Sequence, residues 1–508
     1  MPSGSEPVVG VARSVALVGL RAVDVTVEVS ISAGLPCFSL IGTTGTAGRQ
    51  AGERVRAALH ATGIRLPSRK ILASLAPADV PTSGARFDLA LAAALLVRLG
   101  AVASSALTDA AFLGELALDG TVRAVSGVLP AAAHLAAAGV DRLFVADDNV
   151  REASLASGIG VIAVGDLSEL LAILDGAAHP RALPARPPPA AADVADLADV
   201  RGQAEARRAL EIAAAGGHHL LLLGPPGCGK SMLAARLVGV LPSLTEQAAL
   251  ELTAIRSVAG LLAGTAPITL DRTPPLRAPH HATTAAALLG GGGGVARPGE
   301  ISLATHGVLF MDELFEWPRR LLDALREPLE QGTVRIARAQ ATVCYPAAFQ
   351  LVCAANPCPC GGAGTCDCTD AEVWTYRRRL SGPLADRIDL APRLSALEAG
   401  HLVDATPGEP SHTVAARVRT AREVARERWG VVNRLASAEP VRATARPAAL
   451  RTLGRAVESG ALSGRGFDRA LRVARTCADL AGDDQVDREH VLEALAHRAA
   501  LRAARVAR

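Results

Sequence analysis

The sequence predicts a multidomain α/β protein. The chain has 508 residues, half of them hydrophobic, whereas a single hydrophobic core rarely grows beyond roughly 300 residues. Residues 175–193 read DGAAHPRALPARPPPAAAD, a Pro/Ala-rich run without helical or strand periodicity, which is typical of an extended connector. Short apolar runs alternate with helical patterns on both sides of it. We therefore expect one α/β domain at 1–175, a linker at 176–192, and further domains after it.

Composition excludes several classes of protein. The formal net charge is only +3, and aromatic residues make up 3% of the chain, which argues against a strongly basic nucleic-acid binder or one built on stacked bases. No apolar run is long enough for a membrane span, and the first residues lack the features of a signal peptide. The nine cysteines include an odd member. We expect a cytoplasmic protein with reduced thiols and no membrane contact.

The first domain shows both strand and helix patterns. Residues Val23 to Ile31 form a β-branched run, and Arg49 to Gly63 have helical periodicity. This alternation predicts a mixed α/β fold.

A phosphate-binding loop follows the linker. The segment GPPGCGKS satisfies the G-x-x-x-x-G-K-[ST] pattern, after an apolar run and before a helical pattern, the context that distinguishes it from a chance match. The loop and the helix amino terminus favour phosphate oxygens, Lys230 reaches the β- and γ-phosphates of ATP, and Ser231 is a ligand for Mg²⁺. The predicted nucleotide-binding residues are Gly224, Pro225, Pro226, Gly227, Cys228, Gly229, Lys230 and Ser231.

Two later apolar runs end in polar residues suited to hydrolysis. The run Gly307 to Glu313 ends in paired acids, of which Asp312 can hold Mg²⁺ and Glu313 can polarise the attacking water. An ordinary helix start is the alternative, because a helical pattern begins at Pro318. Phe349 to Pro357 contains Asn356, which can sense the γ-phosphate or act only as a turn former.

An unusual glycine-rich segment lies between the phosphate loop and the paired acids. Residues Arg277 to Glu300 include His280, His281 and five consecutive glycines, Gly290 to Gly294. A domain linker would not interrupt one ATPase core, so we expect an insert that moves with nucleotide state. Adjacent histidines diverge on a helix or a strand, which argues against a shared metal ion. The glycines permit positive φ angles.

Four cysteines form a compact cluster. Their spacing is C-x-C-x₅-C-x-C, and four thiolates can close a tetrahedral, non-catalytic Zn²⁺ site, although C-x-C is tighter than the usual C-x₂-C. Reduced cysteines in a loop are the alternative. The predicted zinc ligands are Cys358, Cys360, Cys366 and Cys368.

Longer motifs carry a family resemblance. The segments RAPHH, GGGGGVARPGEISLATHGVLFMDEL, NPCPCG and YRRRLSGPLADRIDL resemble the ComM/YifB branch of the magnesium-chelatase-like AAA+ ATPases. The resemblance implies an AAA+ core at 193–400, a small helical lid at 401–508, and a homo-oligomeric ring, expected to be a hexamer, that uses ATP and Mg²⁺.

The resemblance also assigns roles to arginines. Arg387 corresponds to an arginine finger offered to the next subunit's nucleotide; a salt bridge to Asp386 or Asp389 is the alternative. The segment from Leu462 to Gly482 resembles the lid helix that carries a second sensor arginine, for which Arg472 is the first choice and Arg465 the reserve.

The first domain resembles the proteolytic domain of Lon between Phe112 and Asn149. Lon-type peptidases use a serine with a lysine base. The resemblance places Arg86 at the serine position and Leu129 at the lysine position. Ser83 lies near the first position, but Lys70 lies outside the expected segment. We therefore expect an inactive Lon-protease-like domain that assembles the ring or guides substrate.

DNA is the expected substrate. Residues Gly332 to Phe349 alternate in character and predict a hairpin with Arg335 and Arg338 near its tip. In related rings a hairpin at this place binds the DNA backbone without reading sequence; an ordinary exposed hairpin is the alternative. The resemblance implies a helicase or branch-migration motor in recombination or natural transformation. Two other functions remain open: a chelatase-type ATPase subunit that remodels a partner protein without DNA contact, and an inactive-protease adaptor.

Overall fold

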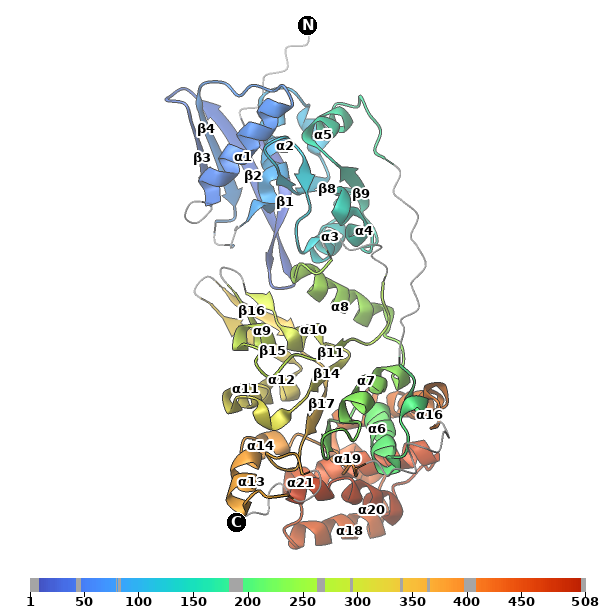
Figure 1. Cartoon of the computed structure of the whole chain (residues 1–508). Helices are drawn as coiled ribbons and strands as arrows, with labels where there is room; N and C mark the ends of the chain where they lie inside the picture. Colours follow the sequence, from blue (N-terminus) through green and yellow to red (C-terminus); the bar gives the residue numbers. More distant parts are fainter. Residues whose placement is uncertain are drawn as a thin grey trace.

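The computed structural model describes residues 9–42, 47–78, 80, 84–181, 195–262, 270–292, 296–338, 341–362, 366–396 and 408–503. Figure 1 shows an amino-terminal α/β domain stacked on a second α/β body, which is followed by a helical carboxyl-terminal region. Most of the predicted linker falls outside the described residues. None of the helices in these ranges is long and apolar enough to cross a membrane.

The amino-terminal domain is built on a seven-stranded mixed sheet of order β3-β4-β2-β1-β5-β8-β9. The pairs β1/β2 and β2/β4 are antiparallel, and the other neighbouring pairs are parallel. The strands are β1 (Gly10–Val18), β2 (Arg21–Ser32), β3 (Cys37–Ile41), β4 (Lys70–Ala76), β5 (Ala110–Leu113), β8 (Arg142–Ala146) and β9 (Gly160–Val164), with β6 (Glu115–Leu116) and β7 (Val122–Arg123) in a small separate ribbon. The expected strand and helix are therefore present, as β2 and α1.

Helices cover both faces of this sheet, because successive strand residues point to opposite sides. Phe112 and Phe144 stack on each other and join a core with α1, α2 and α5. Leu113 and Val145 belong to a separate core with α3 and α4. The helices are α1 (Ala47–Ala61), α2 (Asp88–Arg98), α3 (Val128–Ala137), α4 (Val150–Ala153) and α5 (Leu167–Leu174).

The second body contains a parallel sheet of order β10-β17-β14-β11. Its strands are apolar because both faces are covered, as is usual for parallel sheets. Leu220 and Val352 face one core, while Leu221 and Leu351 face the other. The strands are β10 (Leu220–Leu223), β11 (Leu276–Arg277), β14 (Val308–Met311) and β17 (Gln350–Ala355). This order places β10, β17 and β14 side by side, so their carboxyl ends share one edge.

Helices and two hairpins surround this sheet. The helices are α6 (Ala204–Gly216), α7 (Lys230–Val240), α8 (Glu246–Val258), α9 (Ala285–Leu289), α10 (Glu300–Leu303), α11 (Arg319–Ala324), α12 (Arg326–Gln331), α13 (Asp370–Arg377) and α14 (Gly382–Ala385). The first hairpin is β12 (Gly290–Gly291) with β13 (Arg297–Pro298), and the second is β15 (Thr333–Ala337) with β16 (Thr342–Pro346). The helix expected from Pro318 is divided at Leu325 into α11 and α12.

The carboxyl-terminal region, residues 408–503, is helical, and we call it the lid. Its apolar faces join α6, α7 and the strands in one continuous core, so the lid is packed against the nucleotide core. The lid helices are α16 (Ser411–Trp429), α17 (Ala438–Ala443), α18 (Pro447–Glu458), α19 (Gly464–Ala481), α20 (Arg488–Ala496) and α21 (Ala499–Ala503).

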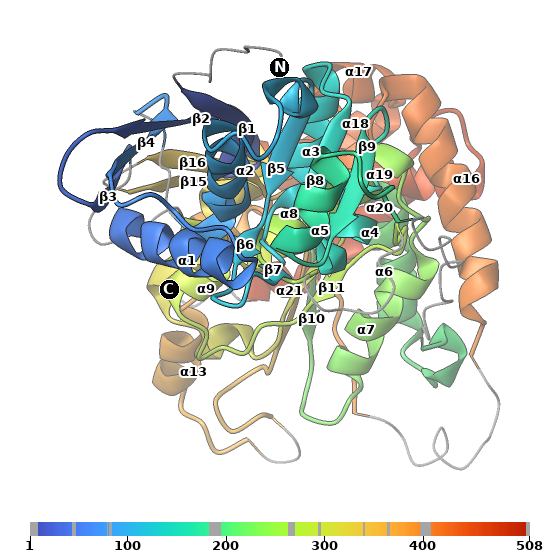
Figure 2. The ribbon, with the colours of Figure 1, turned by 90° about the horizontal axis from the view of Figure 1, so that it is seen from above.

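The amino-terminal domain contacts the nucleotide core along a seam formed by α8 and the second hairpin, as the two views in Figures 1 and 2 show. At the end of α8, Ser257 Oγ donates to Glu152 of the amino-terminal domain, and Ser257 O accepts from Gly127 N at 3.1 Å. The turn between β1 and β2 packs on the second hairpin, where a Cβ at Gly19 would lie 2.5 Å from Val343 Cγ1. A cavity of about 410 Å³ lies in this seam, lined in part by Arg86, Arg297 and Tyr345.

Candidate functional site

The phosphate loop runs from the end of β10 to the start of α7. Gly227 and Gly229 have φ angles of +75° and +92°, a region that side chains rarely adopt. Gly224 is confined in a different way, since a Cβ there would lie 2.7 Å from Leu394 O. The glycines of the motif are therefore required by the backbone path of the loop.

Lys230 is the buried cation of this loop. Its side chain reaches three oxygens: Gly224 O and Pro225 O, both at 2.7 Å, and Asn356 Oδ1 at 3.0 Å. The residue is only 8% exposed. Its buried charge is tolerated because the three acceptors use all three donors of the ammonium group. A phosphate would have to replace some of these oxygens.

Ser231 and Asp312 meet across the edge of the sheet. Ser231 Oγ at the start of α7 donates to Asp312 Oδ2 at 2.7 Å, directly after β14. A hydroxyl and a carboxylate at this distance are the oxygen ligands that Mg²⁺ prefers, with phosphate oxygens and water completing the shell. The predicted magnesium ligands therefore lie together and fit the ion.

Glu313 follows Asp312 in a strained conformation. Its φ angle is +48°, which is uncommon for a residue with a side chain and tends to occur at functional sites. Asp312 Oδ1 accepts from Glu313 N at 2.8 Å. The Glu313 carboxylate is about half exposed, and its Oε2 lies 3.0 Å from Nδ1 of His281. Sequence reasoning did not identify this contact.

The two histidines do not behave as the periodic patterns predict. His280 and His281 lie in a turn after β11, and their ring centroids are 4.0 Å apart. The expectation that their side chains diverge is wrong, because the segment is neither helix nor strand. The pairing of β11 with β14, Arg277 beside Leu309, brings this turn to the Glu313 edge.

The glycine-rich segment is closed at its base. Arg277 donates twice to Glu300, Nε to Oε2 at 2.7 Å and Nη2 to Oε1 at 2.8 Å, so the two ends of the segment are joined. We call residues 277–300 the insert. Gly290, Gly291 and Gly292 have φ angles of +106°, +157° and +117°, as expected for a glycine run; Gly293 and Gly294 lie outside the described residues.

The first hairpin of the insert packs beside the second hairpin. A Cβ at Gly290 would lie 2.6 Å from Ile336 Cδ1, and one at Gly291 would lie 2.7 Å from Arg338 Nη2. Arg338 stands at the turn of the second hairpin, as expected. Arg335 does not, because it is paired with Cys344 within the strands.

Arg387 is buried at the end of α14. Its side chain is 7% exposed, forms an ion pair with Glu330 of α12, and donates from Nη1 to Pro383 O at 2.7 Å. Burial lowers the pKa of Arg387, and the charge of Glu330 opposes that shift. Neither Asp386 nor Asp389 is its ion-pair partner among the described residues. In this protomer Arg387 is held by its own subunit.

The lid arginines lie on α19. Arg472 Nε donates to Ala436 O at 2.8 Å within the lid, and burial lowers its pKa. Arg465 is exposed and its charge acts on Arg387. The structure thus brings Lys230, Ser231, Asp312, Glu313 and Asn356 together, whereas Arg387 and Arg472 have separate local partners.

Family comparisons agree along the chain. Residues 196–402 match the family described as magnesium chelatase, subunit ChlI, residues 27–149 match subunit ChlI of Mg-chelatase, and residues 408–508 match the ChlI carboxyl-terminal region. The chain belongs to the magnesium-chelatase subunit ChlI family. Members of this family are AAA+ ATPases that use ATP and Mg²⁺ and form oligomeric rings.

Similar proteins within the ChlI family cover nearly the full length. A protein of Mycobacterium tuberculosis strain H37Rv is 46% identical over 499 residues, 96% of this chain and 98% of the relative. YifB of Escherichia coli K12 is 41% identical over 493 residues, with 95% and 96% coverage. The competence protein ComM of Haemophilus influenzae is 41% identical over 501 residues, with 96% and 97% coverage. The expected family is confirmed.

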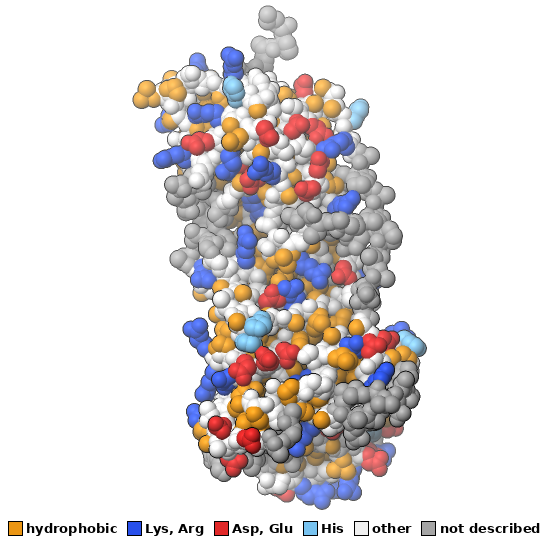
Figure 3. All heavy atoms as spheres, in the orientation of Figure 1, with side chains coloured by type: hydrophobic (Ala, Val, Ile, Leu, Met, Phe, Trp, Pro, Cys, Tyr) orange, Lys and Arg blue, Asp and Glu red, His pale blue; other side chains and the backbone are white. Residues whose placement is uncertain are grey.

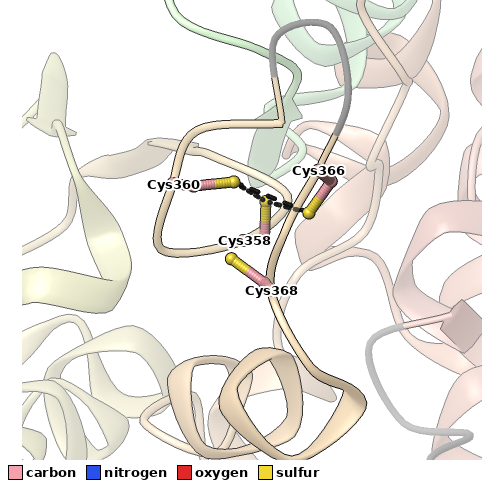
Figure 4. Close-up of side chains that lie close together, drawn as sticks. All are labelled: Cys358, Cys360, Cys366 and Cys368. Atoms are coloured by element: carbon pink, nitrogen blue, oxygen red, sulfur yellow. Dashed lines mark hydrogen bonds between the residues drawn. The ribbon is translucent and has the colours of Figure 1, made fainter.

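The four clustered cysteines converge in this ChlI-family chain (Figure 4). Their sulfur atoms all lie within 4.8 Å of one another, and Cys358 Sγ is 3.3 Å from Cys360 Sγ and 3.4 Å from Cys366 Sγ. A tetrahedron with Zn–S bonds of about 2.3 Å has sulfurs about 3.8 Å apart, so the four thiols fit zinc. The loop also touches the phosphate loop, since a Cβ at Gly361 would lie 2.8 Å from Pro226 Cγ.

Arg86 and Leu129 occupy the two positions expected to correspond to a Lon dyad, and each has its own hydrogen-bond partner. Arg86 Nη2 donates to Ser126 O, three residues before Leu129. Leu129 is buried at the start of α3, and its amide donates to Glu152 Oε1 at 2.9 Å. Lys70 is exposed on β4, and Ser83 lies outside the described residues. Neither Arg86 nor Leu129 can serve as a nucleophile or a base for peptide hydrolysis.

Proposed function

We propose that this protein hydrolyses ATP and uses the energy to move DNA through a homo-oligomeric ring, which we propose is a hexamer. The observation that supports hydrolysis is the convergence of Lys230, Ser231, Asp312 and Asn356 at one sheet edge. Glu313 stands next to this group with a half-exposed carboxylate. These are the parts that phosphoryl transfer from ATP to water requires.

The residues divide the chemistry between them. The oxygen of water bonds to the γ-phosphorus while the bond from that phosphorus to the β–γ bridging oxygen breaks, and ADP leaves. Glu313 accepts the proton of the water. Lys230 turns from its carbonyl partners to the phosphate oxygens, and Asn356 is then free to orient the γ-phosphate or the water. Ser231 and Asp312 would hold Mg²⁺, which neutralises phosphate charge.

Arg387 completes the site from a neighbouring subunit in this proposal. An arginine supplied in trans stabilises charge on the transferring phosphoryl group. Because Arg387 is paired with Glu330 in one protomer, ring assembly or nucleotide binding must exchange that pair for the neighbour's phosphate. We also propose that a second sensor arginine contacts the nucleotide. Arg465 is a better candidate for this role than Arg472, because Arg465 is exposed near Arg387.

The two adjacent hairpins are the proposed DNA contact. They present Arg297 and Arg338, and backbone binding by arginine carries no sequence preference. The global charge does not supply this contact: on the face drawn in Figure 3, basic and acidic side chains are interspersed. The relative ComM is named as a competence protein. That name is consistent with DNA processing in natural transformation, and we extend the role to this chain as a proposal.

DNA-stimulated ATP hydrolysis tests this function. We expect forked or three-stranded DNA to raise the steady-state ATPase rate, with binding that weakens as salt increases. The Glu313→Gln variant serves as the background control, because it should bind ATP and lose at least about a hundredfold in turnover.

A matched pair of arginine variants locates the contact. Arg338→Ala should weaken DNA binding and reduce the salt slope by about one unit, whereas Arg451→Ala, at an exposed position on α18, should not. If DNA neither binds nor changes the ATPase rate of the active protein, the DNA motor is wrong and the chelatase-type partner-remodelling function takes its place.

We propose that the four clustered cysteines bind one structural Zn²⁺, and that this ion supports the phosphate loop. The nine cysteines are free thiols, which suits the cytoplasm. The amino-terminal domain has a Lon-like fold in this proposal, and it joins the ring without peptidase activity.

A further inference from the structure

We propose that the cavity in the seam is a binding site for a small organic phosphate, held between Arg86 of the amino-terminal domain and Arg297 of the insert. The cavity has a volume of about 410 Å³, which falls within the usual range for small-ligand sites, about 300–1,000 Å³. The proposal does not depend on ATP hydrolysis, because the hydrolytic residues do not line this cavity.

The first observation is the set of unused donors on Arg86. This side chain is partly buried in the 3₁₀ turn before α2, and within the described residues it donates one hydrogen bond, to Ser126 O. A guanidinium group carries five N–H donors, so most of those on Arg86 have no protein acceptor there. Burial lowers the pKa of Arg86 to about 10, and the side chain therefore remains a cation at neutral pH.

The second observation is that Arg86 has no carboxylate bonded to it among the residues that the structure describes. The charge of Glu152 acts on Arg86 from a distance. The carboxylate of Glu152 already accepts from Leu129 N at 2.9 Å and from Ser257 Oγ. Burying a cation without a bonded anion costs free energy. A negatively charged ligand in the cavity would offset that cost.

The third observation is a second arginine on the wall that the nucleotide core contributes. Arg297 lies on β13, is exposed, and lines the same cavity as Arg86. Two guanidinium groups match the two charges of a phosphate better than the single charge of a carboxylate. Each planar guanidinium can also donate to two phosphate oxygens at once.

The other lining residues indicate what carries the phosphate. Glu115 lines the cavity, and an ionised carboxylate only accepts hydrogen bonds, so it suits hydroxyl groups of the ligand and not its phosphate. Leu17, Val125 and Val258 supply apolar surface. A phosphorylated sugar combines a phosphate, several hydroxyl groups and a short carbon skeleton. Sugar phosphates are therefore the class of ligand that fits this lining.

A ligand bound to both arginines would join the two bodies of the molecule. Arg86 belongs to the amino-terminal domain, whereas Arg297 belongs to the insert in the nucleotide core, so the phosphate would add contacts across the seam. A ligand that binds the folded chain and not the unfolded chain raises the melting temperature as its concentration increases.

Calorimetric titration of the full-length protein with ribose 5-phosphate tests the site. ADP and Mg²⁺ are kept at saturation, so that the phosphate loop is already filled. We expect ribose 5-phosphate to bind, inorganic phosphate to bind more weakly, and ribose not to bind. Arg297→Ala and Arg86→Lys should each weaken binding about tenfold or more, because each loses charge-assisted hydrogen bonds. Arg123→Ala, at an exposed position on β7 outside the cavity, is the matched control.

Melting curves provide the second measurement. Ribose 5-phosphate should raise the melting temperature of the wild type and of Arg123→Ala, and should leave that of Arg297→Ala unchanged. Melting without ligand reports on folding, and Arg297→Ala keeps the test valid if Arg86→Lys does not fold, because Arg297 is exposed on a hairpin.

Three results would overturn the proposal. The first is a wild-type protein that binds neither ribose 5-phosphate nor inorganic phosphate. The second is equal affinity for ribose 5-phosphate in Arg297→Ala and Arg123→Ala. The third is binding of single-stranded DNA, but not of ribose 5-phosphate, through Arg86 and Arg297, because the cavity would then be part of a DNA path.

Discussion

At the scale of single residues, Arg387, which we propose as the arginine finger, would need two partners in turn. Arg387 is buried against Glu330, yet its proposed partner is a phosphate on another subunit. A buried cation that loses its carboxylate must find another anion. The ion pair with Glu330 therefore has two possible roles. It holds Arg387 until the neighbouring subunit's phosphate replaces the carboxylate, or it stabilises the fold of its own subunit and nothing more.

Variants of both partners separate these two roles. Arg387→Ala should keep ATP binding and reduce hydrolysis about a thousandfold, while Glu330→Ala should leave most of the hydrolysis intact. The measurement is ATPase rate, with Arg387→Ala mixed with Glu313→Gln subunits. In mixed rings each subunit supplies the part that the other lacks, so activity should partly return. An equal loss in Glu330→Ala and Arg387→Ala, with no recovery on mixing, would assign Arg387 a local structural role.

Sequence could place some of these residues and not others. Lys230, Ser231 and Asp312 follow strands whose carboxyl ends share an edge, so periodicity and a motif suffice. His281 lies in a turn. Glu330 lies on α12, which follows the break at Leu325. Their contacts depend on tertiary folding, and neither spacing nor residue type indicates them.

At the scale of elements, the cysteine loop matters through its contact with the phosphate loop. Gly361 packs on Pro226, and the backbone amide of Gly362 lowers the pKa of Cys360 to about 7. Burial raises the pKa of Cys358 to about 12. The loop therefore begins with thiols of very different acidity, which a metal ion would bring to a common deprotonated state.

Metal content and nucleotide affinity should change together. We expect one zinc per chain in purified protein, measured by elemental analysis. Cys358→Ser or Cys366→Ser should lose the zinc and weaken ATP binding, because the support beneath Pro226 loosens. Cys37→Ser, a cysteine of β3 in the amino-terminal domain, is the control. Wild-type protein without zinc, or a zinc-free variant with normal ATP affinity, would contradict this prediction.

Elements were predicted well where the pattern is long. The expected strand at Val23 to Ile31 is β2, and the lid helix from Leu462 to Gly482 is α19. The helix expected from Pro318 is broken at Leu325, because Pro328 has no N–H to donate to Ala324 O and its ring crowds that carbonyl. Arg335 was expected near the tip of the second hairpin, but the turn begins three residues later, at Arg338. The alternating pattern predicts two paired strands, but it does not give the length of the turn between them.

At the scale of the whole molecule, the seam between the two bodies is centred on a buried carboxyl group. Glu152 accepts from Leu129 N, from Asn149 Nδ2 at 3.3 Å, and from Ser257 across the seam. Burial raises the pKa of Glu152, and its hydrogen bonds oppose the shift without cancelling it. Residues 105 positions apart in the chain make this contact, so no sequence pattern could have indicated it.

The seam should become less stable as pH rises. A carboxyl group whose folded pKa is raised binds its proton more tightly in the folded state, so its contribution is complete below the unfolded pKa of about 4.3 and is lost as pH rises through the folded value. Glu152→Gln mimics the protonated form. The melting temperature of Glu152→Gln minus that of the wild type should therefore increase as pH rises from the unfolded pKa to the folded pKa of Glu152. Above the folded pKa the difference should stay constant. A difference that does not vary with pH would show that Glu152 titrates normally.

The Arg277–Glu300 clamp determines where this fold can tolerate change in evolution. Doubling the length of a flexible loop costs only about 0.6 kcal/mol of closure entropy, and here the ends are held by two hydrogen bonds whatever lies between them. Residues can be added to or removed from the interior of the insert without moving β11 or α10. The hairpin that we propose as a DNA contact can therefore change in length while Arg277 and Glu300 keep the ends of the insert in place.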